Sequence, residues 1–585
     1  EYLFSELRIP AYCKNPIEHI VKILTKNNLQ EDVRQIQRIQ RAYNKYKEQG
    51  GRENLTELIK LMKQQIEIET GIYVNTNAGV ELMKNSLNLD VKKRLESFIS
   101  CITRIGLEAD VYSPLKKFKE KFEEEYGKNV HVPLTQIIDP SGFNGLELLG
   151  RQNENKLSER EIKIENLFEK KIQEAIYSGK RKAELFSKDF EKVEKIEDGL
   201  TESFDLNIIL TKTGDKAHLT IGPNLGAMAA GRSFQRFSDV FNEEDFTRYN
   251  QIYKFLNMQE EIIELREYPA MGRAANLINN AELRESSLAL GMPLSKEKTA
   301  VKLEHLAVGL NESGLYLVWI DKNTRCKIAI DNMINSKLNS CLFNFIKAIS
   351  EDSTRIYIIE RFDFLLSNQY IYTPEIRIEV TVALERWRIT EDLVNATDLD
   401  SFEKSFREFD QIYNLPDFFY LCKNDNRLLL AKNCDVTSQI LYQEIKRIKI
   451  VHLSAIEEGL LGESYVKNHE GENFVSECVF SFYQTGTQKK HQQLCENRLI
   501  QNQKRILKPF QEGWIYLKLY INPEQENAFL ITFQKKLHEL GIENFFFLRY
   551  FDESGKHIRL RIKYIDERSA IYKFQRLNKW LQDIT

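Results

Sequence analysis

The sequence predicts an α+β protein built of several subdomains. The chain has 585 residues, of which 42% are hydrophobic and 11% aromatic, so it exceeds what one hydrophobic core organises. Helical periodicity dominates residues 14–110, whereas short apolar runs alternate with helical segments over residues 203–400. Length and these two patterns together predict helical and mixed regions, which is an α+β organisation.

Charge, cysteine spacing and hydropathy argue against a globally basic nucleic-acid-binding protein, a metal site and a membrane-spanning protein. Lys and Arg number 83 and Asp and Glu 86, giving a net charge of −3, so any nucleic-acid surface must be local. The eight cysteines are scattered without a Cys-x-x-Cys pair or a Cys/His cluster. This spacing predicts no metal site and fits a reducing cytoplasm. No run has the apolar length of a transmembrane helix or the pattern of a signal peptide.

The helical segments are predicted from apolar spacing. Residues 17–24 and 55–62 each give one apolar face, and a helix is expected over residues 80–89. Residues 115–125 predict a charged, solvated helix that ends at Gly127. Residues 153–198 are rich in Glu and Lys and predict a solvated helical pair.

Strands are predicted from residue 203 onward. The first covers residues 203–210, and further runs lie at 315–320, 327–330, 356–359 and 376–384. A helix over 401–412 then precedes a β-pair that ends at Leu430.

Residues 545–563 predict a β-hairpin, because two apolar runs flank the polar turn 552–556. In the second strand the isoleucines and leucine at 558, 560 and 562 share one face. The opposite face carries His557, Arg559 and Arg561, with Arg549 available from the preceding strand. Arginines in fixed positions suit bidentate binding of carboxylate or phosphate. Basic residues also protect edge strands from aggregation, and the pattern alone leaves both interpretations open.

Residues 226–237 are the second segment of interest. Small residues allow the backbone to approach closely there, and Arg232 and Arg236 follow at helical spacing. The alternative is that Gly226 and Gly231 pack a helix whose arginines lie on the surface. The residues alone favour this alternative.

The hairpin and its surroundings resemble the class I lantibiotic dehydratases. The C-terminal domain of that family opens with a strand similar to residues 513–520. It continues to a Phe-Phe-x-Arg-Tyr segment, matched by 546–550, and to a His-x-Arg-x-Arg strand, matched by 557–561. The resemblance extends more thinly over most of the chain, including a Tyr-Gly at 126–127 followed by Val-Pro-Leu at 132–134.

The resemblance implies a bacterial enzyme of lanthipeptide and bacteriocin biosynthesis. The family dehydrates Ser and Thr of a ribosomal precursor peptide to dehydroalanine and dehydrobutyrine. It first esterifies the hydroxyl with glutamate from glutamyl-tRNA, a co-substrate, and then eliminates the glutamate without a further cofactor. In elimination, Arg559 and Arg561 would engage the glutamyl group or stabilise the leaving carboxylate, supported by His557 and Arg549.

The resemblance also implies residues for the glutamylation step. The family uses an arginine near a small-residue run, and Arg236 and Arg232 both compete for that role. It commonly has an Asp in a short strand that corresponds to residues 73–76, where this chain has Asn75. Asn keeps the size and one acceptor of Asp but loses its charge.

The expected organisation follows from the same resemblance. Residues 1–484 correspond to part of a multi-subdomain glutamylation domain, 485–512 to a basic linker, and 513–585 to the start of an α/β elimination domain. Because the chain opens with Glu1 and both sites are incomplete, we expect a piece of a longer protein.

The expected partners are the leader-containing precursor peptide, glutamyl-tRNA and a second copy in a homodimer. A cyclase and a transporter are further expected partners, through which a cytoplasmic enzyme would associate with the membrane. Two alternatives stay open. One is a peptide–aminoacyl-tRNA ligase-like enzyme without elimination, and the other is a non-catalytic peptide- or RNA-binding protein.

Overall fold

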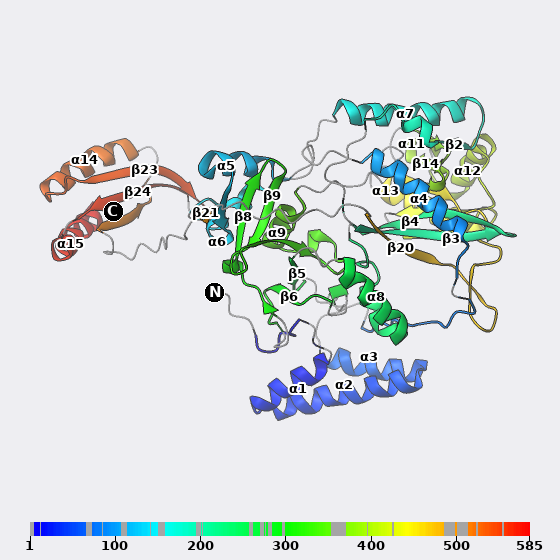
Figure 1. Ribbon diagram of the computed structural model, residues 1–585, viewed down its shortest axis with the longest axis horizontal. Coiled ribbons are helices and arrows are strands. Elements are labelled where there is room, and N and C mark those ends of the chain that lie inside the picture. Colours follow the sequence, from blue (N-terminus) through cyan, green and yellow to red (C-terminus); the bar gives the residue numbers. More distant parts are fainter. Residues whose placement is uncertain are drawn as a thin grey trace. The chain divides into compact units, whose positions relative to one another are not determined.

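The computed structural model forms two compact units, Glu1–Ile500 and Gln501–Thr585 (Figure 1). The structure describes residues 5–584 apart from positions 12, 14, 66–72, 85, 107–113, 141, 150–157, 195–200, 202, 228, 257–260, 270–273, 275–276, 279–282, 295–298, 353–369, 395, 424–425, 485–497, 500–512, 522–524, 553–554 and 565. The predicted strand at 356–359 lies outside the described residues, as does the predicted linker 485–512 except for positions 498 and 499. Both units mix helices and sheets, so the α+β prediction is confirmed.

The first unit begins with helices, as the apolar periodicity predicted. Helices α1 (Pro16–Lys26), α2 (Gln30–Gln49) and α3 (Arg52–Gln65) follow one another and pack in sequence. Asn15 starts α1, because its side chain accepts a hydrogen bond from the Glu18 amide at 3.2 Å.

The predicted helix over residues 80–89 is wrong. The amide of Met83 instead donates to the carbonyl of Lys467 at 2.9 Å, so this stretch runs beside another part of the chain. The side chain of Asn88 accepts from the Asp90 amide at 3.0 Å and caps α4 (Leu89–Arg104). The cap sets the start of the helix at Leu89, where the prediction had ended it.

An eight-stranded sheet forms one core of the first unit. Its strands, in spatial order, are β21 (Arg498–Leu499), β1 (Val130–Pro133), β8 (Leu306–Asn311), β9 (Gly314–Trp319), β10 (Thr324–Ala329), β5 (Glu261–Glu267), β6 (Ser286–Leu290) and β7 (Thr299–Ala300). Helices α5 (Lys116–Tyr126), α6 (Leu134–Ile137) and α9 (Cys341–Glu351) contribute to this core. The prediction that α5 is a solvated helix is wrong for one of its faces. This face is buried, because Phe118 and Phe122 are 0% exposed. Gly127 ends α5 with φ of 76°, as predicted.

A six-stranded sheet forms the second core. Its strands, in spatial order, are β2 (Lys182–Glu184), β12 (Glu375–Ile378), β13 (Val380–Ala383), β4 (Lys216–Ala227), β3 (Ser203–Thr213) and β20 (Glu477–Tyr483). Helices α4 and α7 (Glu159–Tyr177) bury Phe98 and Phe168 in its core. The predicted helical pair over 153–198 is wrong, because α7 is followed by β2 and a 3-10 turn, η3 (Ser187–Phe190).

A five-stranded sheet forms the third core. Its strands, in spatial order, are β11 (Tyr372–Thr373), β14 (Arg386–Thr390), β17 (Ile450–Ala455), β15 (Phe418–Lys423) and β16 (Asn426–Ala431). Helices α12 (Leu399–Tyr413) and α13 (Asp435–Ile448) supply its apolar cover. The helix predicted at 401–412 and the β-pair ending at Leu430 are confirmed.

Shorter elements connect these cores. They are η2 (Gly145–Leu148), η4 (Gln235–Val240), α8 (Glu243–Leu256), η6 (Leu303–His305), η7 (Ser336–Leu338), α11 (Glu391–Val394), β18 (Val466–Lys467) and β19 (Asn473–Phe474). Within the described ranges, every helix is too short or too polar to cross a membrane.

The second unit is a three-stranded antiparallel sheet with two helices. Strand β24 (Gly555–Lys563) lies between β22 (Trp514–Leu519) and β23 (Phe545–Asp552). Helices α14 (Glu526–Glu539) and α15 (Glu567–Ile584) share a core with the sheet. The predicted hairpin is confirmed, with Asp552 opposite Gly555 at its turn.

The buried face of α5 gives a direct stability test. Phe118→Ala should lower the free energy of unfolding by about 3–5 kcal/mol, because it leaves a cavity between Phe122, Phe143 and Phe345. Denaturant unfolding followed by circular dichroism measures the change. Glu120→Ala on the exposed face of the same helix is the control and should change stability by less than about 0.5 kcal/mol. Equal effects of the two changes would contradict the buried placement.

Candidate functional site

The pleat of β24 separates an apolar face from a basic one. Ile558, Leu560 and Ile562 are at most 3% exposed, and Leu560 and Ile562 belong to the core that the sheet shares with the helices of the second unit. Alternation along the strand therefore places His557, Arg559 and Arg561 on the other face, as predicted.

Aromatic rings surround the basic face of β24. The guanidinium carbon of Arg559 lies 3.5 Å from the ring centre of Tyr550. That of Arg561 lies 5.6 Å from the ring centre of Tyr516 and 5.7 Å from that of Phe546. Within the described part of the chain, neither arginine has a carboxylate partner. The rings hold both cations by cation–π attraction and leave N–H groups of both guanidiniums, other than the Nε–H of Arg559, available to an anion.

His557 is linked to the same arginine pair. It is 4% exposed, and its ring lies between those of Tyr520 at 4.9 Å and Tyr550 at 5.6 Å. The Nε of Arg559 donates a hydrogen bond to Nε2 of His557 at 3.2 Å. The imidazole thereby orients the guanidinium from below the exposed surface.

The structure does not bring Arg549 to this face. Arg549 lies opposite Ile558, and directly paired residues of antiparallel strands share a face. Its guanidinium forms an ion pair with Glu526 and donates to Asn527 Oδ1 at 2.6 Å, both at the start of α14. The prediction that Arg549 supports Arg559 and Arg561 therefore disagrees with its position.

A buried carboxylate organises the small-residue segment at 226–237. Asp205 accepts hydrogen bonds from the amides of Gly231 at 2.7 Å and Ser233 at 2.9 Å, and from the Ser481 hydroxyl at 2.6 Å. Burial raises the pKa of Asp205, and these three donors act in the opposite direction. The alternative of a helix packed by Gly226 and Gly231 is wrong. Residues 226–227 end β4, Gly231 lies in a turn with φ 85°, and η4 follows.

Arg232 and Arg236 have different surroundings. The Nε of Arg232 donates to the Asn332 carbonyl, which ties the segment to the loop after β10. Burial lowers the pKa of Arg232, and the carboxylates of Glu351, Asp331 and Asp205 oppose that shift. Arg236 stacks on Phe237, with 4.3 Å between the guanidinium carbon and the ring centre, and has no ion pair among the described residues. Of the two, only Arg232 donates a hydrogen bond to a protein carbonyl among the described residues.

Asn75 lies in an exposed, irregular stretch rather than the predicted strand. Gly79, four residues later, packs against the backbone of Val240, the last residue of η4. The Asn75 segment thus passes beside the element that carries Arg236.

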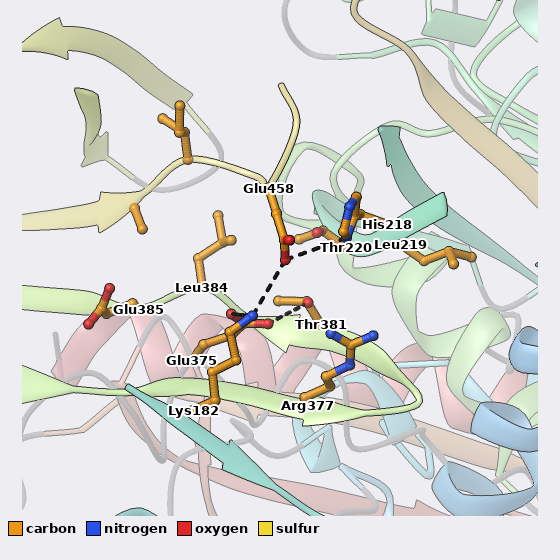
Figure 2. A pocket seen from close by; sticks show the side chains of 12 residues that line it. Lys182, His218, Leu219, Thr220, Glu375, Arg377, Thr381, Leu384, Glu385 and Glu458 are labelled. Atoms are coloured by element: carbon orange, nitrogen blue, oxygen red, sulfur yellow. Dashed lines mark hydrogen bonds and ion pairs between the residues drawn. The ribbon is translucent and has the colours of Figure 1, made fainter. Parts of the chain in front are cut away.

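A cavity of about 210 Å³ lies elsewhere in the first unit, and no sequence pattern predicts it. Its charged lining includes Lys182, Glu375, Arg377 and Glu458, which come from β2, β12 and the chain after β17 (Figure 2). These residues are up to 276 positions apart, so no local motif could reveal their proximity. Among the described residues, no group of three or more His, Cys, Asp or Glu side chains is placed to hold a metal ion.

Comparison with known protein families shows to which family this chain belongs. The family described as "Lantibiotic dehydratase, N terminus" matches residues 1–441. The chain belongs to the lantibiotic dehydratase family. The family "Lantibiotic biosynthesis dehydratase C-term" matches residues 514–585 of this lantibiotic dehydratase, which include the hairpin.

Relatives are similar over nearly the whole chain. The subtilin biosynthesis protein SpaB of Bacillus subtilis is 24% identical over 617 aligned residues, covering 100% of this chain and 59% of SpaB. The nisin biosynthesis protein NisB of Lactococcus lactis subsp. lactis is 25% identical, covering 91% of this chain and 54% of NisB. This lantibiotic dehydratase chain thus spans somewhat more than half the length of these relatives.

Two solved structures share the fold. The tRNA-dependent lantibiotic dehydratase MibB from Microbispora sp. 107891 aligns with a TM-score of 0.67 and 17% identity, covering 99% of this chain and 58% of MibB. The glutamylation domain TbtB, from thiomuracin biosynthesis, aligns with a TM-score of 0.50 and 12% identity, covering 77% of this chain and 57% of that chain. At these identities the likeness concerns the fold.

The turn that presents Arg236 depends on Gly231. A Cβ at this position would clash with the Tyr249 hydroxyl, and the φ of 85° disfavours any side chain. Gly231→Ala should therefore destabilise the turn by at least about 1–3 kcal/mol from backbone strain alone. Hydrogen exchange of amides 229–240 should accelerate. Gly106→Ala is the control, because its Cβ would meet no atom closer than 3.5 Å. Unchanged exchange in Gly231→Ala would refute this geometry.

Proposed function

We propose that the protein dehydrates Ser and Thr of a ribosomal precursor peptide by glutamylation from glutamyl-tRNA followed by glutamate elimination. The observation that carries the proposal is the basic face of β24. It presents Arg559 and Arg561, backed by His557 and aromatic rings, without a carboxylate partner in the described part of the chain. Family membership supports it.

The chemistry explains why arginines are needed. Hydroxide is a poor leaving group, so the hydroxyl is first converted to a glutamyl ester. Elimination then removes the α-proton, the freed electron pair forms the Cα–Cβ double bond, and the Cβ–O bond breaks to release the glutamate carboxylate. Negative charge develops on the enolate and on the leaving group, and preorganised guanidinium groups stabilise both.

For the glutamyl transfer we assign Arg236 rather than Arg232. Its guanidinium has no ion pair among the described residues, whereas Arg232 is engaged by the Asn332 carbonyl. Asn75, on the segment beside η4, would then contribute an amide where the family commonly has a carboxylate.

Replacing Arg559 or Arg561 by Lys in the full-length protein tests the elimination step. Lys keeps the charge but loses the planar fork, so elimination should slow by about 10²–10³-fold. Mass spectrometry should then show precursor peptide that carries glutamyl esters and is not dehydrated. Arg549→Lys is the matched control, because Arg549 lies on the opposite face of the sheet and a Lys there can still pair with Glu526.

The outcomes separate the alternatives. Normal dehydration by both Arg variants would remove the catalytic assignment of this face. Glutamylated or aminoacylated peptide from the wild type without any dehydration would favour a ligase-like enzyme. Peptide or RNA binding without either product would favour a non-catalytic binding protein.

A tRNA surface is proposed at the start of α5. Lys116 and Lys117 are exposed in its first turn, which holds no acidic residue, although the helix dipole disfavours cations at that end. Lys116→Glu/Lys117→Glu should weaken binding of glutamyl-tRNA and reduce the slope of log affinity against log salt by about 0.9 per lost phosphate contact. Filter binding over a salt series measures both.

The matched control is Lys92→Glu/Lys93→Glu, an exposed adjacent pair on α4 that changes the net charge equally. Equal loss in both double variants would indicate a general charge effect rather than a surface at α5. Binding that does not depend on salt would contradict the tRNA proposal itself.

A further inference from the structure

Strand β23 lies at an edge of the sheet in the second unit. Among the described strands it pairs with β24 alone, and its register from Phe545 to Asp552 has no bulge. Its outer side therefore presents a regular row of backbone N–H and C=O groups. Edge strands that stay in water usually carry Lys, Pro or a bulge, which deter further pairing. Residues 545–551, Phe-Phe-Phe-Leu-Arg-Tyr-Phe, contain neither Lys nor Pro, so this edge is suited to accept another strand.

The ladder with β24 identifies which backbone groups face the free edge. The amide of Lys563 donates to the carbonyl of Asn544 at 2.8 Å, and this pair extends the register of the two strands by one residue. Hydrogen-bonded pairs alternate with non-hydrogen-bonded pairs along an antiparallel ladder. Residues 546, 548 and 550 therefore bond to β24, whereas residues 545, 547 and 549 direct their N–H and C=O groups outward.

Apolar side chains join the free edge to the basic face of β24. Phe546, Leu548 and Tyr550 lie opposite the three basic residues of that strand, and directly paired residues share a face. They are 41%, 51% and 42% exposed. The guanidinium carbon of Arg559 lies 3.5 Å from the ring centre of Tyr550. This cation therefore leans from β24 over β23, toward the free edge.

A strand added to β23 would place one of its residues within reach of Arg559. In an antiparallel pair, the residue opposite Leu548 would belong to a non-hydrogen-bonded pair, with about 4.5 Å between the Cα atoms. Leu548 and Arg559 form a hydrogen-bonded pair, with about 5.5 Å between theirs. The added residue thus lies about 10 Å from Arg559 across the sheet, and its side chain projects on the basic face.

A glutamyl ester has the length to span that distance. The glutamyl group of glutamyl-tRNA is transferred through its α-carboxyl carbon, so its side-chain carboxylate stays free on the ester. Seven bonds separate this carboxylate carbon from the peptide Cα, about 9 Å when extended. Because Arg559 leans toward the same edge, its terminal N–H groups can bind the carboxylate above Tyr550. An unmodified Ser or Thr side chain ends far short of Arg559.

We propose that β23 binds the precursor peptide as an added antiparallel strand, with the glutamylated residue opposite Leu548. This mode of binding rests on the elimination proposed above and adds how the substrate is held. Hydrogen bonds to the backbone of residues 545, 547 and 549 fix the register of the peptide without reading its side chains. One edge can therefore serve Ser and Thr with different neighbours. A second copy of the chain or another segment of the protein could occupy the edge instead, and the tests separate these occupants.

Peptides with single N-methyl groups test the pairing on the unchanged full-length protein. The probe has nine residues, alternately Ala and Thr, around a central diaminopropionate that is acylated by the α-carboxyl group of glutamate, a stable amide in place of the ester. N-methylation of either residue next to the centre removes an N–H that faces β23 and should weaken binding at least about tenfold. N-methylation of the centre, or two positions away, should weaken it less than about threefold, because those N–H groups point away. Fluorescence anisotropy measures the affinities.

Phe547→Pro tests the same contact from the protein side. Pro is tolerated on edge strands where its missing N–H faces solvent, and here it removes one outward donor. Probe binding should weaken about tenfold, and KM for glutamylated peptide should rise more than kcat falls. Phe547→Ala is the matched control, because it removes the same side chain and keeps the N–H, so affinity should stay within about twofold. Melting temperatures of both variants show whether they fold.

Several results would overturn strand docking at β23. One is equal weakening by N-methylation at every position, without the period of two. Another is amides 545, 547 and 549 exchanging as slowly as 546, 548 and 550 in the free protein, which would show that a second copy or another segment already covers the edge. A third is normal turnover by Phe547→Pro while Arg559→Lys stalls, which would leave the elimination proposal intact. Failure of that proposal would appear differently, as normal dehydration by Arg559→Lys, and would overturn both.

Discussion

The second unit depends on the alternation of side chains along β24. Three apolar residues of this strand, Ile558, Leu560 and Ile562, are buried, and Leu560 and Ile562 share a core with the helices. Because the backbone pleat has a period of two, that burial leaves the intervening positions on the opposite face. A shift of one residue in register would bury two guanidinium groups, at a cost far above what a single domain can bear. Hydrophobic packing on one face thus fixes the position of the basic groups on the other.

Arginines in this chain differ in role because their partners differ. Arg549 and Arg232 are engaged by protein groups, a carboxylate at the start of α14 and a backbone carbonyl. Arg236, Arg559 and Arg561 lie instead against aromatic rings. A ring holds a guanidinium through its face and leaves the in-plane N–H groups unused. Among these five arginines, the type of neighbour therefore separates the two that are engaged by protein groups from the three that we propose as ligand-binding residues.

Sequence patterns predicted helices and strands that depend on neighbouring residues, and they missed contacts between residues far apart in the sequence. The hairpin, the first helices and the strand at 203 follow from periodicity within a few residues, and the structure has all three. The helix expected at 80–89 fails because pairing with Lys467 overrides its apolar spacing. Likewise, the charges of α5 predict a solvated helix and obscure Phe118 and Phe122, which contact a core made by distant strands.

The candidate sites also differ in whether a local sequence pattern or a contact between distant residues determines them. The face of His557, Arg559 and Arg561 could be predicted because one strand carries all three residues. The exclusion of Arg549 could not, since it depends on the cross-strand register with Ile558. Asp205, which holds the turn before Arg236, lies 26 positions from Gly231 in the sequence, and nothing in its neighbours marks it as buried.

The contact between Arg559 and His557 restricts where the imidazole can carry a proton. A guanidinium has only donors, so Nε2 of His557 must offer its lone pair to the Nε–H of Arg559. The neutral ring then has its hydrogen on Nδ1, and no lone pair remains for a substrate. In this arrangement Nε2 of His557 is occupied by Arg559 and is not open to a ligand unless Arg559 moves away. For the elimination proposed above, the base would therefore be a group other than Nε2 of His557.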